Sequence, residues 1–393
     1  MPPSSLNRPA GCSGVNKAGI YLHIPFCRTK CYYCAFNSHA GREAEIPAYM
    51  QALHGQIQRM GSHPWSRNRS FSSLYIGGGT PTICDSSQLT ELIANSFAHF
   101  QLDAHAEITV ETNPNTLSAE KLLALARAGV NRLSIGVQSF SARQLTNLGR
   151  SHTVEDVYLA FAMARSAGFS NINLDLMYGL PGQTAREWRE TLETAVSLAP
   201  EHFSLYELTV EEKTPLAALI ANGQCVLPTE DQVADMEEVT GELLADKGYQ
   251  RYEISNYAKP GFMCRHNSNY WQNCSWLGLG AGAVGSLSGT KVSNTADPAL
   301  FISRINNDEE PVSEIECLCR PAHFRETMIM GLRMLAGISV PELEKRFQLN
   351  PLHYYGKTME TLLEQDMLVL QDGWLRLSRK ALPVANQVLA RLV

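Results

Sequence analysis

The sequence has no apolar run that approaches the roughly 20 residues a membrane-spanning helix needs. It also has no excess of basic residues, because 33 Lys and Arg stand against 39 Asp and Glu, a formal net charge of −6. That balance is unlike the basic footprint of nucleic-acid-binding proteins. We therefore expect no nucleic-acid partner and at most peripheral contact with a membrane.

The sequence is not dense in cysteine, with 10 in 393 residues, and this excludes a small secreted scaffold held by disulfides. Residues 1–18 lack the apolar stretch of a secretory signal, and we expect them to form a flexible lead-in. Their Ser and Arg content leaves an organelle-targeting role open. The expected location is the cytoplasm, where clustered cysteines more often serve metal or redox chemistry than disulfides.

Short apolar segments alternate with helical patterns up to about residue 215. The segments, rich in branched and aromatic residues, are expected to be strands buried on both faces: 20–24, 74–76, 108–110, 133–135, 172–176 and 203–206. Ser118, and Thr184 with Glu187, have the residue types that cap helices between them. The alternation predicts an α/β fold with a parallel sheet, curved into a partial (βα) barrel, with a flat doubly wound sheet as the alternative.

Residues 19–215 form the expected core, and the sequence pattern changes twice after it. Residues 216–310 are expected to form an extension with a helix near 230–247 and an aromatic, Gly-rich stretch. Residues 311–393 are expected to form a small domain with helices at 341–347, 351–365 and from about 381. Two short strands around Asp372-Gly373 predict a hairpin, so this domain is typical of a winged helix. A fold alone implies no DNA binding.

The strongest local pattern is three cysteines within eight residues, Cys27, Cys31 and Cys34, directly after the first expected strand. Sulfur ligands favour iron–sulfur clusters or zinc. Structural zinc uses four ligands, whereas a four-iron cluster on three cysteines leaves one iron open to bind another molecule. The spacing favours the cluster. The alternatives are zinc with Cys264 or His266 as a fourth ligand, or a disulfide with one free thiol.

A second group of residues is expected at the carboxyl ends of the parallel strands, where ligands bind in such folds. Three successive glycines, 77–79, precede Thr80 and let a ligand approach the main chain closely. Polar side chains lie near the C-terminal ends of other expected strands, namely Glu111, Gln138 and Asp175, and Arg150 lies in the loop after Gln138.

These residues together resemble the radical S-adenosylmethionine (SAM) superfamily, whose signature is the CxxxCxxC loop after the first strand. The chain is most similar to the branch that contains oxygen-independent coproporphyrinogen oxidases and HemW-type heme chaperones. The segments that carry this resemblance are residues 21–27, 77–81, 136–140, 174–181 and 266–271.

The resemblance implies two cofactors and an electron donor. It implies that Cys27, Cys31 and Cys34 hold a [4Fe-4S] cluster whose fourth iron is chelated by the methionine part of SAM. The positions that match the family's SAM contacts are Tyr21, Gly78, Gly79, Thr80, Glu111, Gln138, Arg150 and Asp175.

Two functions compete within this branch. The oxidases, which decarboxylate porphyrinogen propionates, carry a further cysteine two positions after the third, where this chain has Phe36. HemW-type chaperones share the phenylalanine and the HNxxYW motif, here residues 266–271, and pass heme to recipients such as respiratory enzymes. We therefore expect a heme chaperone, with His266 as the candidate heme ligand and Cys264 a weaker one. The alternative functions are the oxidase and a radical SAM enzyme that acts on another substrate. The sequence also leaves open whether the chain forms a homodimer.

Overall fold

The computed structural model describes residues 17–393. Residues 1–16 of the expected lead-in lie outside the described residues. Lys17 and Ala18, also assigned to the lead-in, instead begin the first strand, β1 (Lys17–Ile24).

One twelve-stranded sheet forms the larger part of the described chain, in the order β14-β13-β12-β11-β1-β4-β5-β6-β7-β8-β10-β9. Its parallel centre pairs β11 with β1 and continues from β1 through β4, β5, β6 and β7 to β8. The bounds of these strands are β4 Ser70–Gly78, β5 Gln101–Thr112, β6 Arg132–Gln138, β7 Ile172–Tyr178, β8 His202–Glu207 and β11 Trp276–Leu279. The antiparallel edges are β9 Gln250–Arg251, β10 Asn256–Ala258, β12 Val284–Leu287, β13 Thr290–Asn294 and β14 Val312–Cys317.

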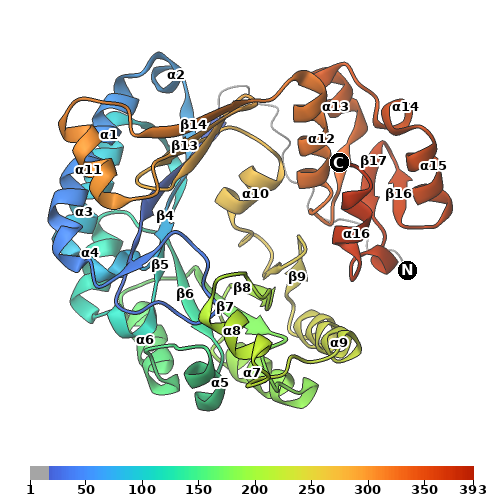
Figure 1. Ribbon diagram of the computed structural model, residues 1–393, viewed down its shortest axis with the longest axis horizontal. Coiled ribbons are helices and arrows are strands. Elements are labelled where there is room, and N and C mark those ends of the chain that lie inside the picture. The colour runs from blue at the N-terminus through green and yellow to red at the C-terminus, as the bar shows by residue number, and fades with distance from the viewer. Residues whose placement is uncertain (1–16) are drawn as a thin grey trace.

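Helices cover the convex side of this sheet, which curves into a partial barrel as expected (Figure 1). They are α1 Ile46–Ser62, α2 Pro64–Arg67, α3 Ser86–His99, α4 Ala119–Arg127, α5 Ala142–Asn147, α6 Val154–Ser166, α7 Ala185–Ser197, α9 Glu230–Asp246 and α11 Pro298–Asn306. Helix α8 (Pro215–Ala221) instead packs near the strand ends, in a small separate hydrophobic cluster. Ser118 caps α4, and Thr184 with Glu187 forms the capping box of α7, as predicted. None of the helices among residues 17–393 is long and apolar enough to cross a membrane.

Alternation along the strands divides apolar from polar side chains. In β6, Leu133, Ile135 and Val137 belong to the main hydrophobic core. Arg132 and Ser134, on the other face, are buried but polar. Burial of the apolar side chains on the helix side stabilises the fold by roughly 1.5–3 kcal/mol for each large side chain. This stabilisation allows the concave side to carry polar groups. Helix α10 (Arg265–Trp271) lies on that concave side (Figure 1).

The C-terminal module has its own hydrophobic core, which includes Phe324, Leu362 and Leu375. It contains α12 Arg320–Gly331, α13 Val340–Phe347, α14 Pro351–Tyr355, α15 Lys357–Glu364, α16 Ala385–Ala390, and a sheet of β15 Ile338–Ser339, β17 Trp374–Leu377 and β16 Leu368–Gln371. The predicted hairpin is present as β16–β17.

Two predictions in this module were wrong. The single helix over 351–365 is two helices, because Gly356 has φ +47° and ψ −121°, which ends α14 before α15 begins. The last helix begins at Ala385 and not near 381, since residues 379–381 form a separate 3₁₀ turn.

Candidate cofactor cavity at the strand ends

The loop that carries the three cysteines runs between the short paired strands β2 (Phe26–Cys27) and β3 (His39–Ala40). Lys30 fixes its shape by donating hydrogen bonds from Nζ to the carbonyl oxygens of Phe36 and Ser38, both at 3.1 Å. The backbone of Tyr32 is bonded on both sides, to the carbonyl oxygen of Leu148 and the amide of Leu216. All three cysteines line a cavity of about 490 Å³.

The three thiols do not converge on a point. Among residues 17–393 no three His, Cys, Asp or Glu side chains are grouped so that they could hold one metal ion. A single zinc ion needs such convergence, whereas each thiolate in a four-iron cluster binds a different iron. The arrangement therefore fits a cluster better than zinc. Burial raises the pKa of the Cys27 thiol and so favours its neutral form, and the positive charge of bound iron would act in the opposite direction.

The glycine loop after β4 touches the cysteine loop directly. A Cβ on Gly79 would lie 2.6 Å from the carbonyl oxygen of Phe26 and 2.9 Å from Cys27 Sγ, so only glycine fits here. The amide of Gly79 donates to Ile24 at 2.9 Å, and Thr80 Oγ1 donates to Cys27 Sγ at 3.5 Å. The expected glycine loop and the expected cysteine loop are thus in direct contact and together form one wall of the cavity.

Two half-buried acids also line the cavity. Glu111 accepts hydrogen bonds from the Tyr75 hydroxyl at 2.8 Å and the Gly78 amide at 3.0 Å. Burial raises its pKa to about 7, against the lowering effect of the Tyr75 bond. Asp175 accepts from Asn173 at 2.7 Å and Ser134 at 3.1 Å, and burial raises its pKa too. Glu111 can therefore donate or accept a proton near neutral pH.

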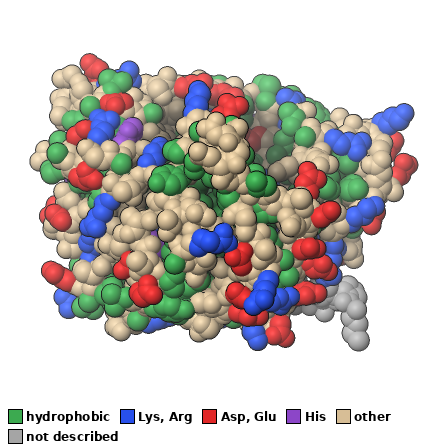
Figure 2. All heavy atoms as spheres, turned by 60° about the horizontal axis from the view of Figure 1, so that its bottom comes forward, with side chains coloured by type: hydrophobic (Ala, Val, Ile, Leu, Met, Phe, Trp, Pro, Cys, Tyr) green, Lys and Arg blue, Asp and Glu red, His purple; other side chains and the backbone are tan. Residues whose placement is uncertain are grey.

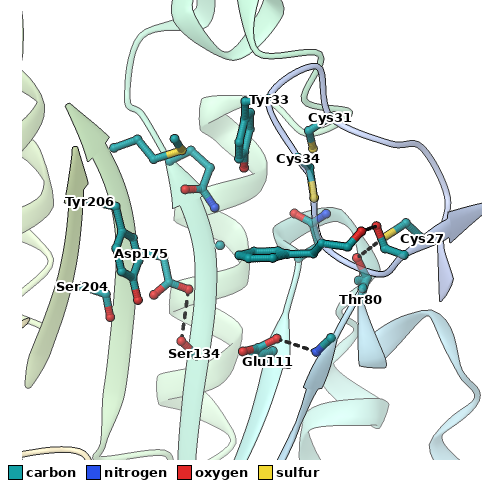
Figure 3. Close-up of a pocket in the computed structure, with 18 of the residues that line it drawn as sticks. Cys27, Cys31, Tyr33, Cys34, Thr80, Glu111, Ser134, Asp175, Ser204 and Tyr206 are labelled. Atoms are coloured by element: carbon teal, nitrogen blue, oxygen red, sulfur yellow. Dashed lines mark hydrogen bonds between the residues drawn. The ribbon is translucent and has the colours of Figure 1, made fainter. Parts of the chain in front are cut away.

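Arg150 links the acid end of the cavity to the cysteines. Its Nη1 donates to Cys31 Sγ at 3.3 Å, and its Nη2 donates to the carbonyl oxygen of Gly136 at 2.7 Å and to Asn113. Gln138 lines the same cavity with a left-handed backbone, φ +66°. Figure 3 shows the cysteines on one side of the cavity and Asp175, Ser204 and Tyr206 on the opposite side.

Tyr21 does not line the cavity, although it was expected among the ligand contacts. Its hydroxyl is hydrogen-bonded to His23 Nδ1 at 2.8 Å, and its ring lies beside Tyr75 and His266. The other expected SAM-contacting residues all line the cavity: Gly78, Gly79, Thr80, Glu111, Gln138, Arg150 and Asp175.

His266 is buried beneath the cavity and does not line it. Its Nδ1 is bonded to Ser73 Oγ at 2.8 Å and its Nε2 to the Tyr270 hydroxyl at 2.7 Å, with 1% of the residue exposed. Burial lowers its pKa to about 3. Neither ring nitrogen is free to bind heme iron in this conformation, so the structure does not support that role. Cys264 is also fully buried, with Sγ 3.4 Å from Glu107 Oε1, and cannot complete a zinc site with the cysteine loop.

Several cavity residues were not singled out from the sequence: Tyr75, Arg132, Ser134, Asn173, Ser204, Tyr206 and Asn267. The signal was present as polar residues at every second position, as in Arg132 and Ser134, or Asn173 and Asp175. We expected these strands to be buried on both faces and therefore apolar throughout. In the structure one face of the strands is polar and lines the cavity.

The fold and the cysteine loop define a radical SAM protein with an additional C-terminal domain. The Radical SAM superfamily matches residues 21–195 and the HemN C-terminal domain matches residues 319–384. A solved structure described as "Coproporphyrinogen III oxidase (HemN) from Escherichia coli is a Radical SAM enzyme" superposes with a TM-score of 0.83 over 96% of this chain and 90% of that one. The identity is 23%, so this likeness concerns the fold.

Similarity to curated relatives shows which family of radical SAM proteins the chain belongs to. Heme chaperone HemW of Bacillus subtilis (strain 168) is 36% identical over 94% of this chain and 97% of its own length. Heme chaperone HemW of Escherichia coli (strain K12) is 42% identical over 68% of this chain and 70% of its own. The chain belongs to the HemW family of radical SAM proteins.

Proposed function

We propose that the chain is a heme chaperone, which binds heme and passes it to recipient proteins such as respiratory enzymes. Cys27, Cys31 and Cys34 hold a [4Fe-4S] cluster in this proposal, and the residues that line the cavity beside them bind SAM. Family membership, and three thiols that share one cavity without converging on one ion, support both cofactors. The cluster requires an electron donor.

The residues of the cavity divide the work of holding SAM. Together with the cluster, SAM supplies one-electron cleavage of a carbon–sulfur bond when both are bound. Arg150, beside Cys31, suits the methionine carboxylate because its planar guanidinium can pair with both oxygens. Glu111 and Asp175 suit the ammonium and the ribose hydroxyls, since buried acids bind such donors strongly.

Phe36 is the observation that favours a chaperone over an oxidase. It lines the cavity on the cysteine loop with 71% of the residue exposed, at the position where the oxidases carry another cysteine. An exposed ring there offers an apolar face on which a porphyrin can pack. A thiol, which could take part in redox chemistry, is absent from that position.

The test combines two assays on anaerobically reconstituted protein. Hemin-loaded protein should transfer heme to an apo-hemoprotein acceptor, measured by recovery of the acceptor's Soret spectrum. The same protein, given coproporphyrinogen III, SAM and a reductant, should form no protoporphyrinogen above the level of a Cys27→Ala variant. Robust protoporphyrinogen formation would overturn the chaperone proposal in favour of the oxidase.

A further inference from the structure

A chain of buried polar side chains supports Asp175 from behind the cavity wall. Asn173, two residues before it on β7, donates from Nδ2 to Asp175 Oδ1 at 2.7 Å. His202, the first residue of β8, is hydrogen-bonded through Nδ1 to Asn173 Oδ1 at 2.6 Å. The other ring nitrogen, Nε2, is bonded to the Tyr252 hydroxyl at 2.9 Å. His202 and Tyr252 are buried and lie outside the cavity lining.

The carboxylate of Asp175 sets the direction of the hydrogen bonds in this chain. Ionised carboxylate oxygens only accept, so the amide nitrogen of Asn173 faces Asp175 and its amide oxygen faces His202. His202 Nδ1 therefore carries a proton and donates it to that oxygen. Burial and the charge of Arg132 lower the pKa of His202 well below its ordinary value, so the ring is neutral. A neutral ring has no second proton, and Nε2 accepts from the Tyr252 hydroxyl.

Two serines hold Asn173 in the same orientation. Ser204 Oγ donates to Asn173 Oδ1 at 3.1 Å. Ser134 Oγ accepts from Asn173 Nδ2 at 2.7 Å and donates to Asp175 Oδ2 at 3.1 Å, the bond drawn in Figure 3. Turning the amide over would place its oxygen against the carboxylate, and two acceptors cannot bond each other.

The far end of the chain is fixed by backbone groups. The amide of Cys264 donates to the Tyr252 hydroxyl at 3.3 Å, and the proton of that hydroxyl remains available for His202. The amide of Tyr252 donates to the carbonyl oxygen of Asn256 at 3.1 Å, and its own carbonyl oxygen accepts from the amide of Leu335 at 3.0 Å. Three separate segments of the protein thus determine where this tyrosine lies.

We infer that His202 and Tyr252 are positioning residues for the proposed SAM site. They act through Asn173, which holds the Asp175 carboxylate so that it can accept hydrogen bonds from the ligand. The assignment of Asp175 to SAM rests on the proposed function. Asn173 and Ser134 each use one lone pair of a different carboxylate oxygen, and the remaining lone pairs are left for a ligand in the cavity. A carboxylate that is already oriented binds more tightly, because the ligand does not have to order it.

The first experiment reads the tautomer of His202 in the unaltered protein, so it holds even where a variant folds poorly. Nitrogen-15-labelled histidine is incorporated into the full-length chain, and two-bond proton–nitrogen correlation spectra are recorded anaerobically at neutral pH. We expect a neutral ring with its proton on Nδ1. The signal is assigned by its absence from the His202→Asn variant. A proton on Nε2, or a charged ring, would contradict the inferred direction of the chain.

The second experiment asks whether His202 acts on SAM through Asp175. Isothermal titration calorimetry measures SAM binding to the reconstituted wild type, His202→Leu, Asp175→Ala and the double variant. We expect His202→Leu to weaken SAM binding about tenfold alone, but less than about twofold in the Asp175→Ala background, where no carboxylate is left to position. His202→Asn, whose amide nitrogen can replace Nδ1 as a donor, should stay within about threefold of the wild type.

The third experiment removes one hydroxyl at the far end of the chain. Tyr252→Phe keeps the ring and should weaken SAM binding about threefold, because the tautomer of His202 is no longer fixed. Tyr249→Phe is the matched control, since its hydroxyl is also buried but donates to the carbonyl oxygen of Pro200 at 2.6 Å. It should bind SAM as the wild type does. Thermal melting and iron content confirm that each variant is folded and loaded.

The outcomes separate this inference from the proposed function. If the reconstituted wild type bound no SAM, the assignment of the cavity to SAM would be wrong, and the inference with it. If the wild type bound SAM but His202→Leu weakened binding equally with and without Asp175, the role of His202 would be structural and only the inference would be wrong. Equal effects of Tyr252→Phe and Tyr249→Phe on SAM affinity would likewise contradict the role of Tyr252.

Discussion

Burial shifts the pKa of single residues in the cavity, and Glu111 gives the clearest test. Its buried carboxyl has a pKa of about 7 in the folded chain, against an ordinary value of 4.5. The folded state therefore holds this proton more tightly than the unfolded state. Its contribution to stability is fully present below pH 4.5 and is lost as pH rises to about 7.

Glu111→Gln should remove that dependence, because the amide does not titrate. Between pH 4.5 and pH 8 the free energy of unfolding of the wild type, in the absence of cofactors, should fall by on the order of 2–3 kcal/mol more than that of the variant. Urea denaturation at the two pH values measures the difference. Equal falls in the two proteins would show that Glu111 is not shifted by burial.

Phe36 and His266 make opposite predictions for heme. Phe36→Ala should weaken hemin binding about tenfold, since an aromatic face is lost from the cavity.

His266→Ala should leave hemin affinity within about twofold but lower the free energy of unfolding by about 2 kcal/mol, because Ser73 and Tyr270 lose a buried partner. Absorption titrations and urea denaturation measure both effects. A hemin affinity that fell with His266→Ala in a stable variant would restore the iron-ligand role to His266.

The contact between the glycine loop and the cysteine loop matters most among the structural elements. Gly79→Ala would push the carbonyl of Phe26 and Cys27 Sγ apart from β4, so we expect cluster content to fall to less than about half of the wild type. Gly241→Ala in the exposed face of α9 is the control, since no heavy atom lies within 4 Å of the added Cβ. It should keep full cluster content and stabilise the helix by roughly 0.5–1 kcal/mol. Iron and sulfide analysis of both variants decides the matter.

Elements with local signals were predictable from the sequence, and those fixed by long-range packing were not. The presence and order of six parallel strands and the caps of α4 and α7 follow from residue type and spacing, although β5 begins at Gln101, seven residues before the expected segment. The parallel pairing of β11 beside β1 joins residues more than 250 positions apart, and no local pattern encodes it. For the same reason the HNxxYW motif was placed near heme, although α10 buries its histidine against β4.

In the whole molecule, Asn273 connects the barrel to the C-terminal module. Its Nδ2 donates to Glu326 at 3.1 Å and Thr327 at 2.9 Å, and its carbonyl oxygen accepts from Arg346 at 2.8 Å. Asn273→Ala removes the side-chain bonds at a left-handed position, φ +48°, that asparagine tolerates better than alanine.

This change should loosen the module without unfolding the barrel. Hydrogen exchange of the amides in α12 should speed up at least about tenfold, while β5 and β6 stay protected as in the wild type. Asn222→Ala, in the exposed C-cap of α8, is the matched control and should leave α12 unchanged. Uniform acceleration throughout the chain, or none in α12, would contradict a local docking role for Asn273.

The two large bodies of the molecule suggest a division of labour. The barrel carries every residue that lines the cavity, and the C-terminal module contributes none of them. On the face shown in Figure 2, acidic and basic side chains are interspersed, and hydrophobic side chains gather around a hollow near its middle. The residues proposed to hold the cofactors therefore all belong to the barrel, and the proposed cluster ligands lie on the cysteine loop.

Mössbauer spectroscopy of iron-57-enriched protein, purified without oxygen, tests that starting point most directly. We predict the quadrupole doublets of a diamagnetic four-iron cluster, with one iron altered on addition of SAM, and loss of the signal in Cys27→Ala. Protein that instead contained stoichiometric zinc and no acid-labile sulfide would contradict the cluster and, with it, the assignment of the cavity to SAM.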